Sequence, residues 1–487
     1  MSNEIRNLEP KTLWNNFADL NAVPRGSKKE EKVIKFMVEF GERLGLETIV
    51  DPVENVIIKK PATAGMENRK TVVLQSHLDM VHQKNNDTIF DFDNEGIKMI
   101  VDGDWVSADG TTLGADNGLG VAAIMSILAS DSIAHPAIEA LFTIDEETGM
   151  TGAMGLQAGY LDGEILLNLD TEDDSEIDMG CAGGIDISAT NNYKQEDILD
   201  NTLIMKLEVK GLNGGHSGMD IDKGFGNANK IMNRLLYETF DFEINIVSIH
   251  GGSLRNAIPR ESETILAIPT SKLAGFKAKI ETISSDIKKE FATMDAGLII
   301  ELSPCEKTFT KAMSTRSQMN LIKAVYAAHN GVYRMSPDME DLVETSNNVA
   351  VIVVEEGTAT IDCLTRSAVE SSKMDLAQAL RSTFELAGYS VTFSGSYPGW
   401  EPNVNSPILA VMTDLYTNMF NEKPDVVACH AGLECGILGT HYPDMDMISF
   451  GPTIHGAHSP DERASISSTQ KFWKYLLEIL ENIPTRD

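Results

Sequence analysis

Apolar residues recur at helical spacing near the start of the chain. After Pro24, the run Ser27-Lys28-Lys29-Glu30 has the form of a capping box, in which serine and glutamate side chains bond the first free N–H groups of a helix. The apolar residues that follow at helical spacing are Val33, Ile34, Met37, Phe40 and Leu44. This pattern predicts an amphipathic helix that begins after the capping box and ends near Gly45.

Short runs of β-branched and apolar residues then alternate with helical patterns. The expected strands are 56–58, 71–75, 138–144 and 165–169, and the expected helix is 118–129. Alternating strands and helices are typical of an α/β sheet that is covered by helices.

The pattern changes after about residue 185. The expected order becomes strand, helix, strand, strand, helix, strand, which is a split βαβ arrangement. The strands are 203–209, 244–250, 264–268 and 298–302, and the helices are 227–240 and 273–288. A similar but incomplete order follows, with helices at 321–329 and 376–387 and strands at 349–354, 358–364 and 391–393.

The first pattern returns after Pro398-Gly399-Trp400, with a helix at 408–420, a strand at 447–450 and a closing helix at 469–482. We therefore predict a discontinuous α/β domain, 1–185 plus 398–487, with a mixed, mostly parallel sheet flanked by helices. The inserted domain, 186–397, is expected to be α+β and to consist of two halves that each resemble a split βαβ unit.

The composition excludes several classes of protein. Lysine and arginine number 40 and aspartate and glutamate 73, so the formal net charge is −33. That charge repels phosphate backbones and anionic membranes, and we expect neither nucleic acid nor a membrane as partner. The start of the chain lacks the apolar core of a secretory signal, and the five cysteines are scattered and odd in number. Both features favour a cytoplasmic protein.

Histidines and acids follow the ends of the expected strands. They are His77 and Asp79 after 71–75, Asp145-Glu146-Glu147 after 138–144, Asp170 after 165–169, and His455 and His458 beyond 447–450, while Asp116 precedes the helix 118–129. In open α/β sheets, ligands bind at the carboxyl ends of the strands. Each residue alone is more often a cap, a turn residue or a solvated side chain. Together they predict one site at one sheet edge.

The residue types at this edge favour a pair of zinc ions. A closed structural zinc site would use cysteine, whereas histidine and carboxylate ligands suit a catalytic pair. Such a pair needs one bridging carboxylate and can activate a water, whose proton a further carboxylate must accept. Because consecutive side chains diverge at a strand end, one of Glu146 and Glu147 would bind metal and the other would face the water.

The chain resembles the co-catalytic zinc peptidases of the aminoacylase and glutamate-carboxypeptidase type, and among them the aminoacyl-histidine dipeptidases. The motifs that carry the resemblance extend over nearly the whole chain: 76–81, 114–118, 145–152, 168–170, 213–218, 430–434 and the segment around His458. The resemblance implies a metallopeptidase in which 1–185 plus 398–487 is the catalytic dizinc domain and 186–397 is a lid domain.

The resemblance also implies the metal ligands. His77, Asp116 and Asp170 would bind one zinc ion, and Asp116, Glu147 and His458 would bind the other. Asp116 would therefore bridge the two ions.

Other roles follow from the same resemblance. Glu146 would be the general base, and Asp79 would orient His77 by accepting its other ring proton. A cis peptide bond is expected between Asp116 and Asn117. Asp170 stands where carboxypeptidase-like relatives commonly have glutamate, which favours a dipeptidase.

The lid would supply groups that contact the substrate. His216 would donate a hydrogen bond to the oxyanion of the tetrahedral intermediate. Asn256 and Arg366 would hold the carboxylate end of the substrate. The alternatives are a histidine that only packs in a turn and an arginine that only lies on the surface.

The expected function is hydrolysis of dipeptides, including Xaa-His dipeptides, with two zinc ions per chain, for which cobalt or manganese can substitute. The alternative is another amide hydrolase on the same scaffold, such as an aminoacylase, a deacetylase or an aminotripeptidase. A metal- or peptide-binding protein without activity is a third interpretation. The expected partners are a small peptide substrate and a second copy of the chain in a homodimer.

Overall fold

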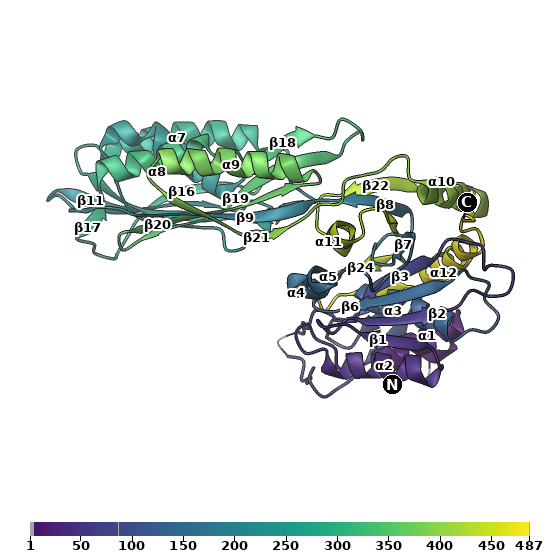
Figure 1. Ribbon diagram of the computed structural model, residues 1–487. Coiled ribbons are helices and arrows are strands. Elements are labelled where there is room, and N and C mark those ends of the chain that lie inside the picture. The colour runs from purple at the N-terminus through teal and green to yellow at the C-terminus, as the bar shows by residue number, and fades with distance from the viewer. Residues whose placement is uncertain (1–3, 86, 487) are drawn as a thin grey trace. The chain divides into compact units, whose positions relative to one another are not determined.

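The computed structural model describes residues 4–85 and 87–486, and the chain divides into two compact units (Figure 1). The first unit comprises Met1–Gly180, Trp400–Ala428 and Leu433–Asp487, and the second comprises Cys181–Gly399 and Cys429–Gly432. The chain thus passes between the units near residues 180 and 400. The boundaries predicted from the sequence pattern, 185 and 398, differ from these by a few residues. The pattern does not indicate the short segment 429–432.

The first unit contains an eight-stranded sheet in the order β1-β2-β6-β3-β7-β23-β8-β22. The strands are β1 (Glu47–Val50), β2 (Val56–Lys60), β6 (Ile138–Thr143), β3 (Val72–His77), β7 (Ile165–Asn168), β23 (Asp446–Ser449), β8 (Glu176–Cys181) and β22 (Asp425–Cys429). The four neighbours β6, β3, β7 and β23 run parallel, whereas β1, β2 and β8 pair in antiparallel fashion. The predicted mixed sheet is confirmed, but it is not mostly parallel, because these pairs are as often antiparallel as parallel; the parallel strands are the central ones.

Helices accompany this sheet. They are α1 (Lys11–Leu20), α2 (Glu31–Arg43), α3 (Ala115–Leu128), α4 (Glu146–Gly149), α5 (Thr151–Gly155), α10 (Pro407–Phe420), α11 (Glu434–His441) and α12 (Ile466–Glu481). Every residue of β3, β6 and β7 is buried, as expected for parallel strands covered on both faces. A small antiparallel sheet joins β24 (Ile454–His455), β25 (Arg463–Ser465), β5 (Trp105–Ala108) and β4 (Met99–Asp102).

The predicted capping box is wrong. The helix α2 begins only at Glu31, because the two polar side chains before it make tertiary hydrogen bonds. Ser27 Oγ donates to Asp79 Oδ2 at 2.8 Å, and Glu30 Oε1 accepts from the backbone N–H of Asp145 at 3.0 Å. The segment before α2 therefore contacts two of the loops that were predicted to carry the site.

The second unit contains a long sheet in the order β16-β11-β15-β13-β19-β20-β9-β21, with β18 beside β19. Its strands are β9 (Gly183–Asn192), β11 (Thr202–Lys210), β13 (Asn245–Gly251), β15 (Ser262–Pro269), β16 (Ile299–Pro304), β18 (Gly331–Met335), β19 (Val343–Glu355), β20 (Thr358–Ser367) and β21 (Ser390–Tyr397). Two short pairs, β10 (Gln195–Asp197) with β17 (Lys311–Met313) and β12 (Gly215–His216) with β14 (Ala257–Ile258), lie outside it. The helices are α6 (Ala228–Glu238), α7 (Leu273–Glu290), α8 (Thr315–Ala327) and α9 (Glu370–Leu386).

The second unit consists of two halves with the same strand order. The first half is β11-α6-β13-β15-α7-β16, whose strands are ordered β16-β11-β15-β13 in the sheet. In the second half the strands are ordered β19-β20-β9-β21, which is the same arrangement read in the opposite direction. The strand β9 therefore takes the place that β11 has in the first half, as the first strand of its half along the chain. The halves join through the antiparallel pair β13 and β19. The second half looks incomplete in the sequence because β9 precedes the whole first half.

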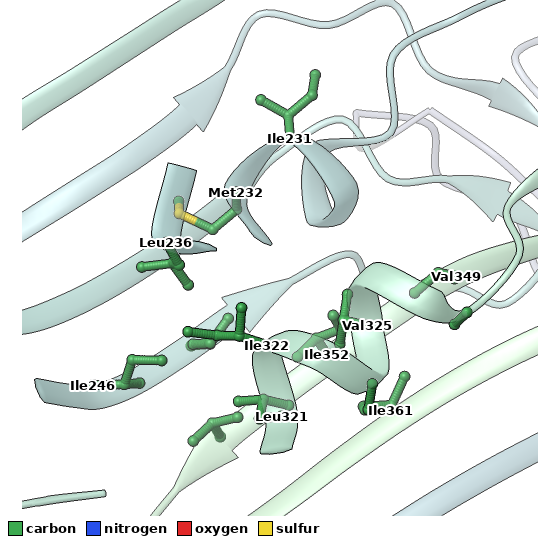
Figure 2. Packing of buried hydrophobic residues seen from close by; sticks show 14 of the residues in the cluster. Ile231, Met232, Leu236, Ile246, Leu321, Ile322, Val325, Val349, Ile352 and Ile361 are labelled. Carbon is green, nitrogen blue, oxygen red and sulfur yellow. The ribbon is translucent and has the colours of Figure 1, made fainter. Parts of the chain in front are cut away.

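The helices of the second unit cover one face of its long sheet (Figure 1). Figure 2 shows Met232 and Leu236 of α6 near Ile322 and Val325 of α8, within one cluster of buried apolar residues. Strand residues such as Ile352 belong to the same cluster. Within the described residues, no helix is both long enough and apolar enough to cross a membrane.

The buried carboxyl group of Asp178 in β8 gives the first prediction. One oxygen accepts from Thr171 Oγ1 at 2.7 Å, and the other has no hydrogen-bond partner among the described residues. Burial raises the pKa of Asp178 to about 7. The unfolded chain loses this proton at lower pH, so the group should destabilise the fold progressively as pH rises from about 4 through 7.

We expect Asp178→Asn to remove this part of the pH dependence, which is on the order of a few kcal/mol. Urea unfolding of the metal-free protein at pH 5 and pH 8 measures it. The exposed Asp109→Asn is the control. Equal differences between the two pH values in Asp178→Asn and the wild type would contradict the assignment.

Candidate active site

The parallel strands bring the predicted residues to one edge of the first unit's sheet. His77 is the last residue of β3 and pairs in register with Thr143 at the end of β6, while Gln75 pairs with Asn168 at the end of β7. The residues that immediately follow β6 and β7 therefore start beside His77. They include Glu146, Glu147 and Asp170.

The structure gathers the five predicted ligands into two groups that share Asp116. One group is His77, Asp116 and Asp170, and the other is Asp116, Glu147 and His458. In each group, one ligand atom from every residue lies within 4.8 Å of the others.

Asp116 turns one carboxylate oxygen toward each histidine. His77 Nε2 lies 3.1 Å from Asp116 Oδ1, and His458 Nε2 lies 3.1 Å from Asp116 Oδ2. His77 Nε2 is also 3.5 Å from Asp170 Oδ1, and His458 Nε2 is 2.8 Å from Glu147 Oε2. This is the arrangement that a bridging carboxylate requires.

The start of α3 holds Asp116 in place. Gly114 adopts a left-handed conformation before the helix, and Asp116 and Asn117 depart from helical geometry. The cis peptide bond predicted between Asp116 and Asn117 is confirmed. Asn117 Nδ2 donates to the backbone oxygen of Leu169 at 2.6 Å and to the Asp170 carboxylate. Asn117 therefore ties α3 to the segment that carries Asp170, a role that the sequence did not indicate.

Asp79 orients two neighbouring segments. Its Oδ1 lies 3.4 Å from His77 Nδ1, and its backbone oxygen lies 3.1 Å from the same nitrogen. The carboxylate also accepts from the backbone N–H groups of Glu146 at 3.0 Å and Glu147 at 3.3 Å. Burial raises the pKa of Asp79, but hydrogen bonds from His77 and Glu146 outweigh it and lower the pKa below its usual value.

Glu146 belongs to neither ligand group within the described part of the chain. Burial, followed by repulsion from Asp170 and Glu434, raises the pKa of Glu146 well above its usual range. Its side chain therefore has a high affinity for a proton. This property suits a general base that must take a proton from water and later release it.

Glu434 is a further buried acid that the sequence reasoning did not single out. Its Oε2 accepts from Gln75 Nε2 at 2.7 Å and from Thr143 Oγ1 at 2.6 Å. Burial raises the pKa of Glu434 to about 8. The only sequence signal was its place in the motif 430–434.

The ligand groups fit a pair of divalent cations. Burial and the neighbouring Asp116 raise the pKa of both Glu147 and Asp170, because their negative charges are incompletely balanced. The buried Oε1 of Glu147 has no hydrogen-bond partner in the part of the chain that the structure describes. Histidine nitrogen and carboxylate oxygen are donors that zinc accepts in open catalytic sites.

In the second unit, His216 lies in the short pair β12–β14, opposite Ala257. Its Nδ1 accepts from the backbone N–H groups of Gly218 at 3.3 Å and Met219 at 3.1 Å. Burial, with the nearby Arg366, lowers the pKa of His216 to about 4. The imidazole is therefore neutral at pH 7, and its Nδ1 serves as a hydrogen-bond acceptor.

Arg366 and Asn256 lie near His216 in the same unit. Arg366 Nη2 is 3.4 Å from His216 Nε2, and Nη1 donates to the Tyr397 hydroxyl at 2.9 Å. Arg366 is only 5% exposed, so the alternative of a surface arginine is wrong. Asn256 is exposed, and its backbone oxygen accepts from Ser217 N–H at 2.8 Å.

Comparisons with known proteins identify the family of this chain. The model of Peptidase family M20/M25/M40 matches residues 73–482. The cytosol non-specific dipeptidase of Escherichia coli (strain K12) is 42% identical over 484 residues, which cover 99% of this chain and 100% of that protein.

Solved structures give the same result. The crystal structure of aminoacylhistidine dipeptidase from Vibrio alginolyticus has a TM-score of 0.92 and 44% identity, and the match covers 100% of both chains. A tripeptidase from Staphylococcus aureus shares the fold, with a TM-score of 0.57 and 18% identity over 98% of this chain and 99% of that one. Because the family model matches most of the chain and two close relatives span its full length, this chain belongs to peptidase family M20/M25/M40, as its sequence motifs predicted.

Proposed function

We propose that this chain is a metal-dependent dipeptidase that hydrolyses the peptide bond of dipeptides, including Xaa-His dipeptides. The observation that carries the proposal is the pair of ligand groups sharing Asp116, with Glu146 beside them. The two full-length relatives, at 42% and 44% identity, support it because both are named dipeptidases.

The residues of the site are suited to hold two zinc ions. His77, Asp116 and Asp170 would bind one ion, and Asp116, Glu147 and His458 would bind the other. When bound, such ions lower the pKa of water and stabilise negative charge. Cobalt and manganese are the expected substitutes, because they accept the same donor types.

Glu146 would move the proton. Its backbone N–H is fixed on Asp79, so the side chain starts from a defined position. Glu146 would take a proton from the attacking water and transfer it to the amine that leaves. Its high proton affinity in the buried site supports both steps.

The second unit would bind and polarise the substrate. His216 would donate from Nε2 to the oxygen of the scissile carbonyl as negative charge develops there. Arg366, whose Nε lacks a partner among the residues described, would bind the terminal carboxylate together with Asn256. We further propose that the enzyme acts in the cytoplasm as a homodimer.

Replacement of Glu146 by glutamine tests the general base. We expect kcat to fall about 100- to 10,000-fold, because glutamine cannot accept the proton. KM and the binding of two metal equivalents should remain close to the wild type. Glu39→Gln, on the exposed face of α2, is the matched control. Retention of wild-type kcat in Glu146→Gln would reject this role.

Metal removal and a substrate panel separate the proposed function from its alternative. We expect the stripped protein to be inactive and to regain dipeptide hydrolysis with zinc, cobalt or manganese. The panel should contain Xaa-His and other dipeptides, tripeptides and N-acyl amino acids. Hydrolysis of N-acyl amino acids without hydrolysis of any free-amine dipeptide would favour an aminoacylase instead.

Substitution of His216 by alanine tests the oxyanion donor. We expect kcat for a dipeptide to fall about 100- to 1000-fold with a small change in KM, because the bond matters chiefly in the transition state. The control is His250→Ala, an exposed histidine of the same unit that pairs with Glu355. Similar kinetic losses in both variants would argue against a specific role for His216.

A further inference from the structure

One glutamate outside the proposed machinery connects two loops that carry ligands. Glu462 follows His458 by four residues and is only 2% exposed. Both of its carboxylate oxygens accept from backbone N–H groups at the start of α3. The donors are Leu113 at 2.7 Å and Gly114 at 2.9 Å to Oε2, and Ala115 at 2.7 Å and Asp116 at 3.3 Å to Oε1.

The loop that carries His458 is a tight turn between the paired strands β24 and β25. Its backbone bonds run from Ser459 N–H to Gly456 O at 3.2 Å and from Glu462 N–H to Ser459 O at 3.0 Å. The His458 side chain is 55% exposed, whereas the side chains of the four other ligands are at most 11% exposed. Its own packing therefore fixes His458 less firmly than the other ligands.

A buried arginine, Arg25, bonds a backbone carbonyl oxygen of the loop that leads to Asp116. Arg25 is 1% exposed, and its guanidinium donates to the backbone oxygen of Gly114. It also donates to the oxygens of Leu78 at 3.2 Å and Asp79 at 3.0 Å, directly after His77. Gly114 is thus bonded by Glu462 through its N–H and by Arg25 through its C=O.

Close packing reinforces this contact. A Cβ atom on Gly114 would lie 2.5 Å from Arg25 Nη2 and 2.7 Å from Met80 Sδ, and Gly114 has a φ of +70°. Only glycine meets both conditions without strain. The loops that carry His77, Asp116 and His458 are therefore linked in series by two oppositely charged side chains.

We propose that Glu462 is a positioning residue that, together with Arg25, sets the spacing of three ligand-bearing loops and so determines how tightly the His458-containing group binds its metal ion. The inference rests on the proposed function only in taking these five residues as metal ligands. A loop that is already ordered loses less freedom when its histidine binds a metal, so the link raises affinity.

Glu462→Gln is the sharpest variant because it keeps the shape of the side chain. It replaces one acceptor oxygen by an NH₂ group that faces backbone N–H donors, so two buried donors lose their partner. Zinc titration of the metal-free protein by calorimetry is the measurement. We expect two tight equivalents in the wild type and one equivalent weakened about 10- to 100-fold in the variant.

A conservative variant and a control variant accompany Glu462→Gln. Glu462→Asp keeps both acceptors on a shorter chain and should weaken the same equivalent less. Asp446→Ala removes a half-buried carboxylate at another helix start, since Asp446 accepts from Ser406 Oγ at 2.6 Å and from Ile408 N–H at 3.1 Å at the start of α10. It should lower the unfolding temperature and leave both zinc equivalents unchanged.

Wild-type affinity for both equivalents in Glu462→Gln, or equal weakening in Asp446→Ala, would overturn the proposal. If Glu462→Gln does not fold, Arg25→Lys takes its place, because lysine cannot reach the three backbone oxygens with planar geometry. Weakened zinc binding is expected there as well, because Arg25 bonds the loops of His77 and of the shared Asp116, and unchanged affinity for both equivalents would again overturn the proposal. If the wild type binds two zinc ions but cleaves no dipeptide, the proposed function fails while this inference remains intact.

Discussion

Repulsion among buried carboxylates at one edge of a parallel sheet is the interaction on which this structure depends. Asp116, Glu147 and Asp170 meet there, and burial together with the charges of Asp170, Glu434 and Glu147 raises the pKa of the neighbouring Glu146. Buried charges are costly unless they are paired. The two histidines that are present cannot balance them all. The fold thus prepares a site whose stability and chemistry both require added positive charge.

Three of the predicted ligands, His77, Glu147 and Asp170, lie at or just after strand ends, and neighbouring polar side chains fix the loops of the site. Asp79 binds the backbone of Glu146 and Glu147, and Asn117 binds the Asp170 segment. Glu462 and Arg25 join the remaining loops. Each of these groups acts on backbone atoms, so it limits loop motion without occupying a position that the substrate needs. Rigid support of this kind is what keeps a multi-ligand site in register.

The sequence predicted those site residues that directly follow a recognisable apolar strand. Apolar runs located β3, β6 and β7, and the polar residues after them located His77, Glu147 and Asp170. It failed where long-range contacts decide the outcome. Ser27 looked like a helix cap because its partner, Asp79, is distant in the chain. Glu462 gave no signal, since the N–H groups that it binds lie about 350 residues earlier.

The strand order of the second unit has a consequence for how the chain acquires its structure. The strand β9 is synthesised before the whole first half, yet its neighbours β20 and β21 come more than 160 residues later. During translation, β9 must stay without its sheet partners until the second half emerges. Pairing β9 with β20 and β21 closes a long loop of chain, so this part of the sheet assembles late and slowly. The delay follows from synthesis of the chain from its N-terminus.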